Sequence, residues 1–137
     1  MTEVNRRQNI QDAVVRGEQS FRAAEALLGM GLCSDAVSRA YYAAFHFLRA
    51  LLVSRGVEPR SHAGAIHLFN TEFVRPKLVP SSHNRLLAGL QRARELADYD
   101  AAVTFSPEDA SGEVADARTF IEETRELLSK EGWLKPA

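Results

Sequence analysis

Hydrophobic residues recur every three or four positions along most of this chain, and no segment alternates hydrophobic and polar residues as a half-buried strand would. That spacing places the apolar side chains of each segment on one face of an α-helix. The chain is therefore expected to be all-α. Roughly five helices are predicted, at about residues 9–30, 34–54, 61–74, 81–97 and 107–128.

Glycine, proline and serine mark the expected helix ends. Gly29 and Gly31 are expected to stop the first helix and Gly56 the second, and two prolines follow the third segment. Ser34 is expected to cap the second helix. The run Ser106-Pro107-Glu108-Asp109 combines a capping serine, a proline at the first helical position and acids in the first turn, which predicts the start of the fifth helix.

Long helices joined by short connections favour an antiparallel, up-and-down helical bundle with about four main helices and one short helix. At 137 residues, the chain is expected to form one domain, 1–137, with its core in about 9–128. The second helix is predicted to be central because its apolar arc is wider than one neighbouring helix needs. That arc consists of Val37, Tyr41, Ala44, Phe45, Leu48, Leu51 and Leu52.

Composition narrows the functional classes. The formal net charge is −1, so a strongly basic surface is not expected, and RNA binding would need a local cationic patch. The single Cys33 cannot form an internal disulfide, which fits a cytoplasmic protein. The N-terminal residues lack the apolar core of a signal peptide, and no apolar run reaches about 18 residues, so neither export nor a membrane span is expected.

No metal or cofactor is expected. His62 and His67 are five residues apart and do not share a helical face, while His83 lies beyond two prolines. Zinc and di-iron sites on helices use ligands three or four residues apart. Ser61 and His62 beside Gly64 fit a capped helix start as well as an anion site. The chain contains neither a glycine-rich phosphate loop after a strand nor a Gly-x-Ser-x-Gly nucleophile motif.

One candidate binding surface lies on the second helix. Arg39, Tyr42, His46 and Arg49 follow one another at offsets of three, four and three residues, which aligns them along one stripe. Arginine can hold phosphate through two hydrogen bonds and tyrosine can stack on a base, so the stripe predicts a phosphate-binding groove. The alternative is a solvated or dimer-facing helix surface, which often carries such residues.

A second candidate lies where the fourth helix ends, in the segment Arg92-Ala93-Arg94-Glu95-Leu96-Ala97-Asp98-Tyr99-Asp100. Arg94 and Asp98 are four residues apart and can pair on a helix, while Tyr99 can pack near the helix end. This structural role and direct contact with a ligand both remain open.

Two runs carry a family resemblance: Ser38-Arg39-Ala40-Tyr41-Tyr42-Ala43-Ala44-Phe45-His46 and Arg94-Glu95-Leu96-Ala97-Asp98-Tyr99. With Gly29-Met30-Gly31, and with His62-x-Gly64 followed by Phe69 and Phe73-Val74, they resemble the HEPN superfamily over about residues 9–128. The resemblance is to its small, single-domain prokaryotic branch. It implies an up-and-down bundle that commonly forms a homodimer, and frequent pairing with a minimal nucleotidyltransferase in toxin–antitoxin modules. Active members of the superfamily are metal-independent endoribonucleases.

The ribonuclease signature of that superfamily is an arginine, four to six further residues, a histidine and often a tyrosine two positions beyond. Arg92 and Tyr99 match it, but Ala97 occupies the histidine position. An alanine methyl group cannot transfer a proton, and general acid or base catalysis is worth about 10²- to 10⁴-fold. The resemblance thus implies a dimeric partner protein with ribonuclease activity in doubt. It would bind a nucleotidyltransferase, a nucleotide or RNA through Arg39, Tyr42, Arg49, Arg94 and Asp98.

Two alternatives stay open. Arg39 and His46 also satisfy the bare signature spacing, and in a dimer His46 of one chain could meet Arg92 or Arg94 of the other. The catalytic set would then be His46, Arg92 and Tyr99, and the protein would be an active metal-independent endoribonuclease toxin. The other alternative is a plain structural adaptor bundle without affinity for nucleotides.

Overall fold

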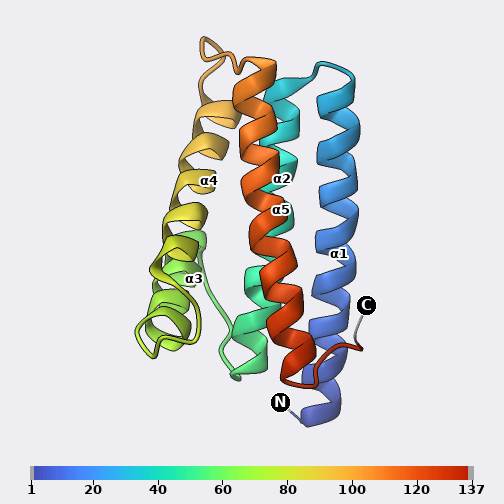
Figure 1. The fold of residues 1–137 in the computed structure, drawn as a ribbon, viewed down its shortest axis with the longest axis vertical. Helices are drawn as coiled ribbons and strands as arrows, with labels where there is room; N and C mark the ends of the chain where they lie inside the picture. The colour runs from blue at the N-terminus through green and yellow to red at the C-terminus, as the bar shows by residue number, and fades with distance from the viewer. Residues whose placement is uncertain (1, 136–137) are drawn as a thin grey trace.

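The computed structural model describes residues 2–135 and consists of helices packed side by side (Figure 1). The helices are α1 (Glu3–Gly29), α2 (Cys33–Ser54), α3 (His62–Phe69), α4 (Ser81–Tyr99) and α5 (Pro107–Lys130). The four long helices alternate in direction along the chain, and the short α3 lies beside the start of α4 (Figure 1). Residues 2–135 contain no strand. The predicted all-α, up-and-down bundle is confirmed.

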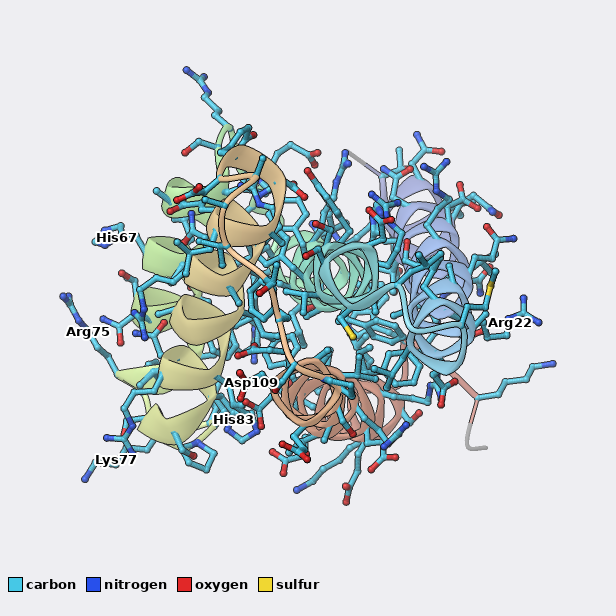
Figure 2. All side chains as sticks on the ribbon, turned by 90° about the horizontal axis from the view of Figure 1, so that it is seen from above. Arg22, His67, Arg75, Lys77, His83 and Asp109 are labelled. Atoms are coloured by element: carbon cyan, nitrogen blue, oxygen red, sulfur yellow. The ribbon has the colours of Figure 1, made fainter. Side chains whose placement is uncertain are left out.

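Helix α2 lies in the middle of the bundle. It contacts α1, α3, α4 and α5, and seen from above its ribbon lies between α1 and α4 with α5 on a third side (Figure 2). Of its predicted apolar arc, only Phe45 is half-buried. The remaining members of the arc are buried, namely Val37, Tyr41, Ala44, Leu48, Leu51 and Leu52. The central position expected from the width of the arc is therefore confirmed.

Left-handed glycines end α1 and α2 as predicted. Gly31 and Gly56 have φ values of 78° and 74°, in the region that favours a residue without Cβ. Beyond α1, the N–H of Leu32 donates to the carbonyl oxygen of Leu27 at 2.9 Å. This bond closes the wide ring of a Schellman motif, so the end of α1 is fixed by local hydrogen bonding.

One of the two predicted serine caps is correct. The Oγ of Ser106 accepts a hydrogen bond from the N–H of Asp109 at 3.0 Å and caps α5. The predicted cap on α2 is wrong, because Leu32 is the N-cap residue and Ser34 lies inside the first turn. The helical hydrogen bonds already start at Leu32, whose carbonyl accepts from the N–H of Ala36 at 3.0 Å.

Helices α1 and α4 extend beyond their predicted ends, and α5 continues to Lys130. Helix α1 starts before residue 9, because the Oγ1 of Thr2 accepts from the N–H of Asn5 at 3.1 Å and caps an earlier turn. Helix α4 continues to Tyr99, and the N–H of Asp100 still donates to the carbonyl oxygen of Leu96 at 3.2 Å. The acidic and aromatic end of α4 is therefore helical rather than part of the loop.

The predicted third helix is divided in two. Helix α3 ends at Phe69 and continues as a π-helical turn over Asn70–Val74, closed by a 2.8 Å bond from the N–H of Arg75 to the carbonyl oxygen of Asn70. The rings of Phe69 and Phe73, both fully buried, stack with their centroids 5.7 Å apart across the change in winding. The two segments thus share one buried face, as their spacing predicts.

At Gly17, helix α1 packs against α2 without room for a side chain. A Cβ at this buried position would lie 2.6 Å from two carbons of the Phe47 ring. Such a contact is far inside van der Waals distance, so the pairing of α1 with α2 requires glycine here.

The outer faces of the bundle are polar. Arg118 pairs with Glu25 at 2.9 Å, and Arg125 pairs with Glu18, which links α5 to α1 through exposed ion pairs. Pairs of this kind stabilise a fold by at most about 1 kcal/mol each. Within residues 2–135, no helix combines the length and the hydrophobicity needed to cross a membrane.

Candidate functional site

The guanidinium of Arg94 is enclosed by tyrosine rings from two helices. Its central carbon lies 5.2 Å from the ring centroid of Tyr41 and 5.8 Å from that of Tyr42, both on α2, and 5.5 Å from that of Tyr99 on α4. Its Nη1 donates to the hydroxyl of Tyr99 at 3.1 Å. We call this group, together with Asp98, the Arg94 corner. Cation–aromatic attraction is strongest where water is excluded, and Arg94 is only 7% exposed.

The charge of Arg94 is only partly balanced. Asp98 lies one helical turn away, with Oδ2 3.7 Å from Nη1, and its other oxygen accepts a hydrogen bond from Ser38 on α2. Burial alone would lower the pKa of Arg94, but the hydrogen bond from Arg94 to Tyr99 and the neighbouring phenols outweigh it and raise the pKa. Its Nε is buried and has no hydrogen-bond partner among the described residues. The guanidinium thus stays charged with an unused donor.

His62 joins this corner from α3. Its Nδ1 is hydrogen-bonded to the hydroxyl of Tyr41, and its ring stacks on Phe45 with the centroids 4.3 Å apart and the planes 9° apart. Burial, and secondarily the charge of Arg94, lower the pKa of His62. The sequence places His62 only at a helix start, and no local spacing reveals a partner 21 residues away. The sole signal is its place in the His-x-Gly run quoted above.

The predicted stripe on α2 is divided between two neighbourhoods. The guanidinium carbon of Arg39 lies 4.9 Å from the ring centroid of Tyr42, so Arg39 borders the Arg94 corner, to which Tyr42 belongs. His46 and Arg49 line a separate hollow of about 320 Å³ with Arg16 of α1. The structure therefore joins the first half of the stripe to α4 and the second half to α1.

His46 faces positive charge. Burial first, and then the nearby Arg16, Arg49 and Arg39, lower the pKa of His46 below its usual 6.5. Arg49 is itself held by Glu58, with Nη2 2.8 Å from Oε1. His46 is therefore neutral near pH 7, and its ring can in principle accept a proton.

Arg92 and Tyr99 lie on the same surface of α4. With Arg94, Glu95, Leu96 and Asp100 they line a shallow hollow of about 590 Å³. Leu96 and Tyr99 are 47% and 76% exposed. His46 is not among the residues of this hollow, so a single chain does not place it in the same hollow as Arg92 and Tyr99.

Ala97 faces a different direction. It packs against the small buried cluster of Val37, Ala93 and Ala110, which joins α2, α4 and α5. It is not among the residues that line the hollow of Arg92 and Tyr99. A side chain at position 97 therefore points toward packed helices rather than toward a ligand in that hollow.

Comparison with known proteins identifies the family. A model of the HEPN domain matches residues 10–127. The chain belongs to the HEPN family. This HEPN chain is 32% identical over 126 residues to "Putative toxin MJ0605" of Methanocaldococcus jannaschii. The aligned region makes up 90% of this chain and 92% of that protein. It is 35% identical over 121 residues to "UPF0332 protein glr0978" of Gloeobacter violaceus, with 88% and 96% covered.

A second protein of Methanocaldococcus jannaschii, "Putative toxin MJ0142", is 26% identical over 133 residues, or 97% of this chain and 90% of that protein. The HEPN match spans all five helices, so the Arg94 corner lies inside the family domain. Residues 2–135 of this HEPN protein contain no group of three or more His, Cys, Asp or Glu side chains that could hold a metal ion.

Proposed function

We propose that this HEPN protein is a toxin-like partner in a two-component module, and that it binds RNA or a nucleotide at the Arg94 corner without cleaving it. The observation that carries the proposal is Arg94 itself, a charged and nearly buried guanidinium with an unpaired Nε beside the exposed Tyr99. A buried donor without a partner calls for an explanation, and a bound ligand that rearranges the guanidinium would supply one. A guanidinium fork binds phosphate, like carboxylate, through paired hydrogen bonds.

The side chains around Arg94 suit a nucleotide. The exposed ring of Tyr99 offers a face on which a base can stack, and base–aromatic stacking is worth about 1–3 kcal/mol per base. Arg92 lies in the same hollow and Arg39 lies over Tyr42, so further cations border the corner. This is the local cationic and aromatic patch that a protein of net charge −1 needs for RNA.

We expect no cleavage because position 97, the histidine position of the signature, carries no proton-transfer group and faces packed helices instead of the hollow of Arg92 and Tyr99. Metal-independent cleavage of RNA needs a group that removes a proton from the ribose hydroxyl and another that returns one to the leaving oxygen. Ala97 supplies neither and packs against Val37 and Ala93. Arg92 and Tyr99, which do match the signature, contact the ligand without taking part in proton transfer.

The test combines binding with cleavage. We expect AMP or a short RNA to raise the melting temperature of the purified protein by mass action, and Arg92→Ala and Tyr99→Ala to remove most of that shift. Arg22→Ala is the matched control, because Arg22 points outward from α1 on the opposite side of the bundle from α4 (Figure 2). No RNA should be cut in EDTA. Robust cleavage that Arg92→Ala abolishes would contradict the proposal, and no thermal shift with either ligand would favour the plain adaptor.

We further infer a homodimer that engages a minimal nucleotidyltransferase. Leu96 and Tyr99 are large exposed side chains on one turn of α4, bordered by Arg92 and Glu95. Such an apolar centre with a charged rim is typical of a protein interface. Light scattering should give twice the chain mass, and Leu96→Glu should return it to one. The partner is tested by looking for a nucleotidyltransferase in the neighbouring open reading frames and by a pull-down of that protein with this one.

A second candidate function is ribonuclease activity through His46. The observation that favours it is the neutral imidazole of His46, which shares a hollow with the guanidinium groups of Arg16 and Arg49. This hypothesis predicts growth arrest on expression and its loss in His46→Ala. If His46→Ala leaves toxicity intact, the assignment fails.

A further inference from the structure

The Arg94 corner contains a histidine that no signature of the chain assigns. His62, the first residue of α3, turns back over α2, where the ring of Phe45 stacks beneath it and the ring of Tyr42 meets it at 87° with the centroids 6.1 Å apart. Three aromatic contacts and a hydrogen bond to Tyr41 hold the imidazole in one orientation. A side chain fixed this firmly is preorganised rather than merely exposed.

The direction of the Tyr41 hydrogen bond follows from the chemistry of its neighbours. Burial raises the pKa of the Tyr41 phenol well above its usual range, so it keeps its proton. The positive guanidinium of Arg94 lies 5.2 Å from the Tyr41 ring and attracts the lone pairs of the phenol oxygen, which directs the phenol proton to Nδ1 of His62. An imidazole that accepts at Nδ1 and is neutral carries its proton on Nε2.

The second nitrogen of His62 is free for a ligand. Within residues 2–135, His62 has a hydrogen bond only through Nδ1, and its side chain is half-buried rather than enclosed. Its Nε2–H is thus a donor of fixed orientation, on a ring that experiences the positive charge of Arg94. Since its basic nitrogen is occupied by Tyr41, this histidine cannot take a proton from a ribose hydroxyl without breaking that bond.

We propose that His62 is a ligand-contacting residue of the Arg94 corner, whose Nε2–H donates to a phosphate oxygen of the bound nucleotide or RNA while Tyr41 holds its Nδ1. The inference rests on the proposed function and extends the site from α2 and α4 to the start of α3. It also gives His62 a role in binding rather than in proton transfer. Tyr41 is a positioning residue, because it acts through His62.

The first test needs no ligand. Long-range ¹⁵N–¹H NMR spectra of the histidine-labelled protein near pH 7 should show His62 protonated on Nε2 and bare on Nδ1. In Tyr41→Phe the Nδ1 partner is gone, and we expect a mixture of tautomers. A protonated Nδ1 in the wild type would overturn the inference while leaving the binding function of Arg92 and Tyr99 untouched.

The second test measures binding of AMP and of an oligoadenylate of about six nucleotides. His62→Phe keeps the stacking and loses the donor, and we expect affinity to fall about tenfold or more. His62→Gln, whose amide can replace Nε2–H, should retain most of the affinity. His67→Phe is the control, since His67 points away from the bundle (Figure 2). Melting temperatures of all variants monitor folding.

The outcomes separate the two proposals. If Arg92→Ala and Tyr99→Ala weaken binding but His62→Phe does not, the role of His62 is refuted and the proposed function stands. If the wild type binds neither probe, both fall. A response to AMP identifies a mononucleotide as sufficient, and a response to the oligoadenylate alone identifies an RNA strand.

Discussion

The guanidinium of Arg94 lies 5.2 Å above the ring centroid of Tyr41, a phenol that is 1% exposed and hydrogen-bonded to His62. A cation from α4 and an imidazole from α3 are therefore joined through one side chain of the central helix α2. Because Tyr41 contacts both, a change at either end alters the charge balance and packing of the whole corner. Four experiments examine this corner and the bundle that supports it.

Arg94→Lys should destabilise the protein by about 1–2 kcal/mol, because a lysine ammonium lacks the planar fork that reaches Tyr99 and covers several rings at once. The denaturation midpoint in urea measures the change. Arg92→Lys is the control, since Arg92 is exposed two residues away and should shift stability by less than about 0.5 kcal/mol. Equal effects of the two substitutions would show that the aromatic contacts of Arg94 contribute nothing.

Stability should fall as the pH drops below about 6.5, the usual pKa of histidine. The pKa values of His46 and His62 are lowered in the folded protein, so the unfolded chain binds more protons between the folded and unfolded values. Their contribution is complete above the unfolded pKa and is lost as the pH falls through the folded pKa. Urea midpoints between about pH 5 and pH 8 would follow it.

Carboxylates oppose this trend at lower pH. Burial raises the pKa of Glu113 and of Asp116 in the folded protein. The stability that these two groups contribute is therefore present at acidic pH and is lost as the pH rises through their raised pKa values. His46→Gln and His62→Gln should each make the urea midpoint depend less on pH. The difference between each variant and the wild type gives the contribution of that histidine. An unchanged profile in both variants would contradict the assignment.

Gly17→Ala should cost about 1–3 kcal/mol, the usual range for inserting a methyl group into a packed interface. The new Cβ would lie 2.6 Å from the Phe47 ring and would push α1 away from α2. Gly112→Ala on α5 is the matched control, because nothing lies within 4 Å of its Cβ position. That substitution should stabilise the exposed helix by up to about 1 kcal/mol. Thermal unfolding of both variants distinguishes close packing from simple helix propensity.

Ala97→His restores the histidine of the signature but should not restore cleavage. Position 97 packs with Val37, Ala93 and Ala110, so an imidazole there must displace part of that cluster and should lower stability by about 1 kcal/mol or more. Incubation of the variant with RNA in EDTA, analysed on a denaturing gel, is the measurement. New cleavage that also requires Arg92 would show that Ala97 alone keeps the protein inactive.

The helical pattern predicts most of the fold because helix formation is local. Periodicity locates α1, α2, α4 and α5, and the ends at Gly31, Gly56 and Ser106 follow from backbone conformation and capping within a few residues. The misplaced cap at Ser34 and the π-helical turn after Phe69 are also local in position. The preference of serine for N-cap positions does not reveal that α2 already starts after Leu32. The helical spacing of Phe69 and Phe73 does not reveal the change to π-helical winding either.

The contacts of the candidate site likewise divide into those that local spacing predicts and those that only the packing of the helices creates. The pairing of Arg94 with Asp98 spans one helical turn and can be predicted from their spacing. The bond between Ser38 and Asp98 crosses 60 residues, and that between Tyr41 and His62 crosses 21. Likewise, only the packing of α1 and α4 against α2 separates Arg39 and Tyr42 from His46 and Arg49.

The sequence by itself determined the helices, the face each one buries, the central place of α2 and the family motifs, because these depend on spacing within single segments. Only the tertiary structure decided that Arg94, Tyr41 and His62 form one corner and that Ala97 faces the packed helices. Contacts between segments far apart in the chain depend on the rotation and register of whole helices against one another, which the pattern within any one helix does not specify.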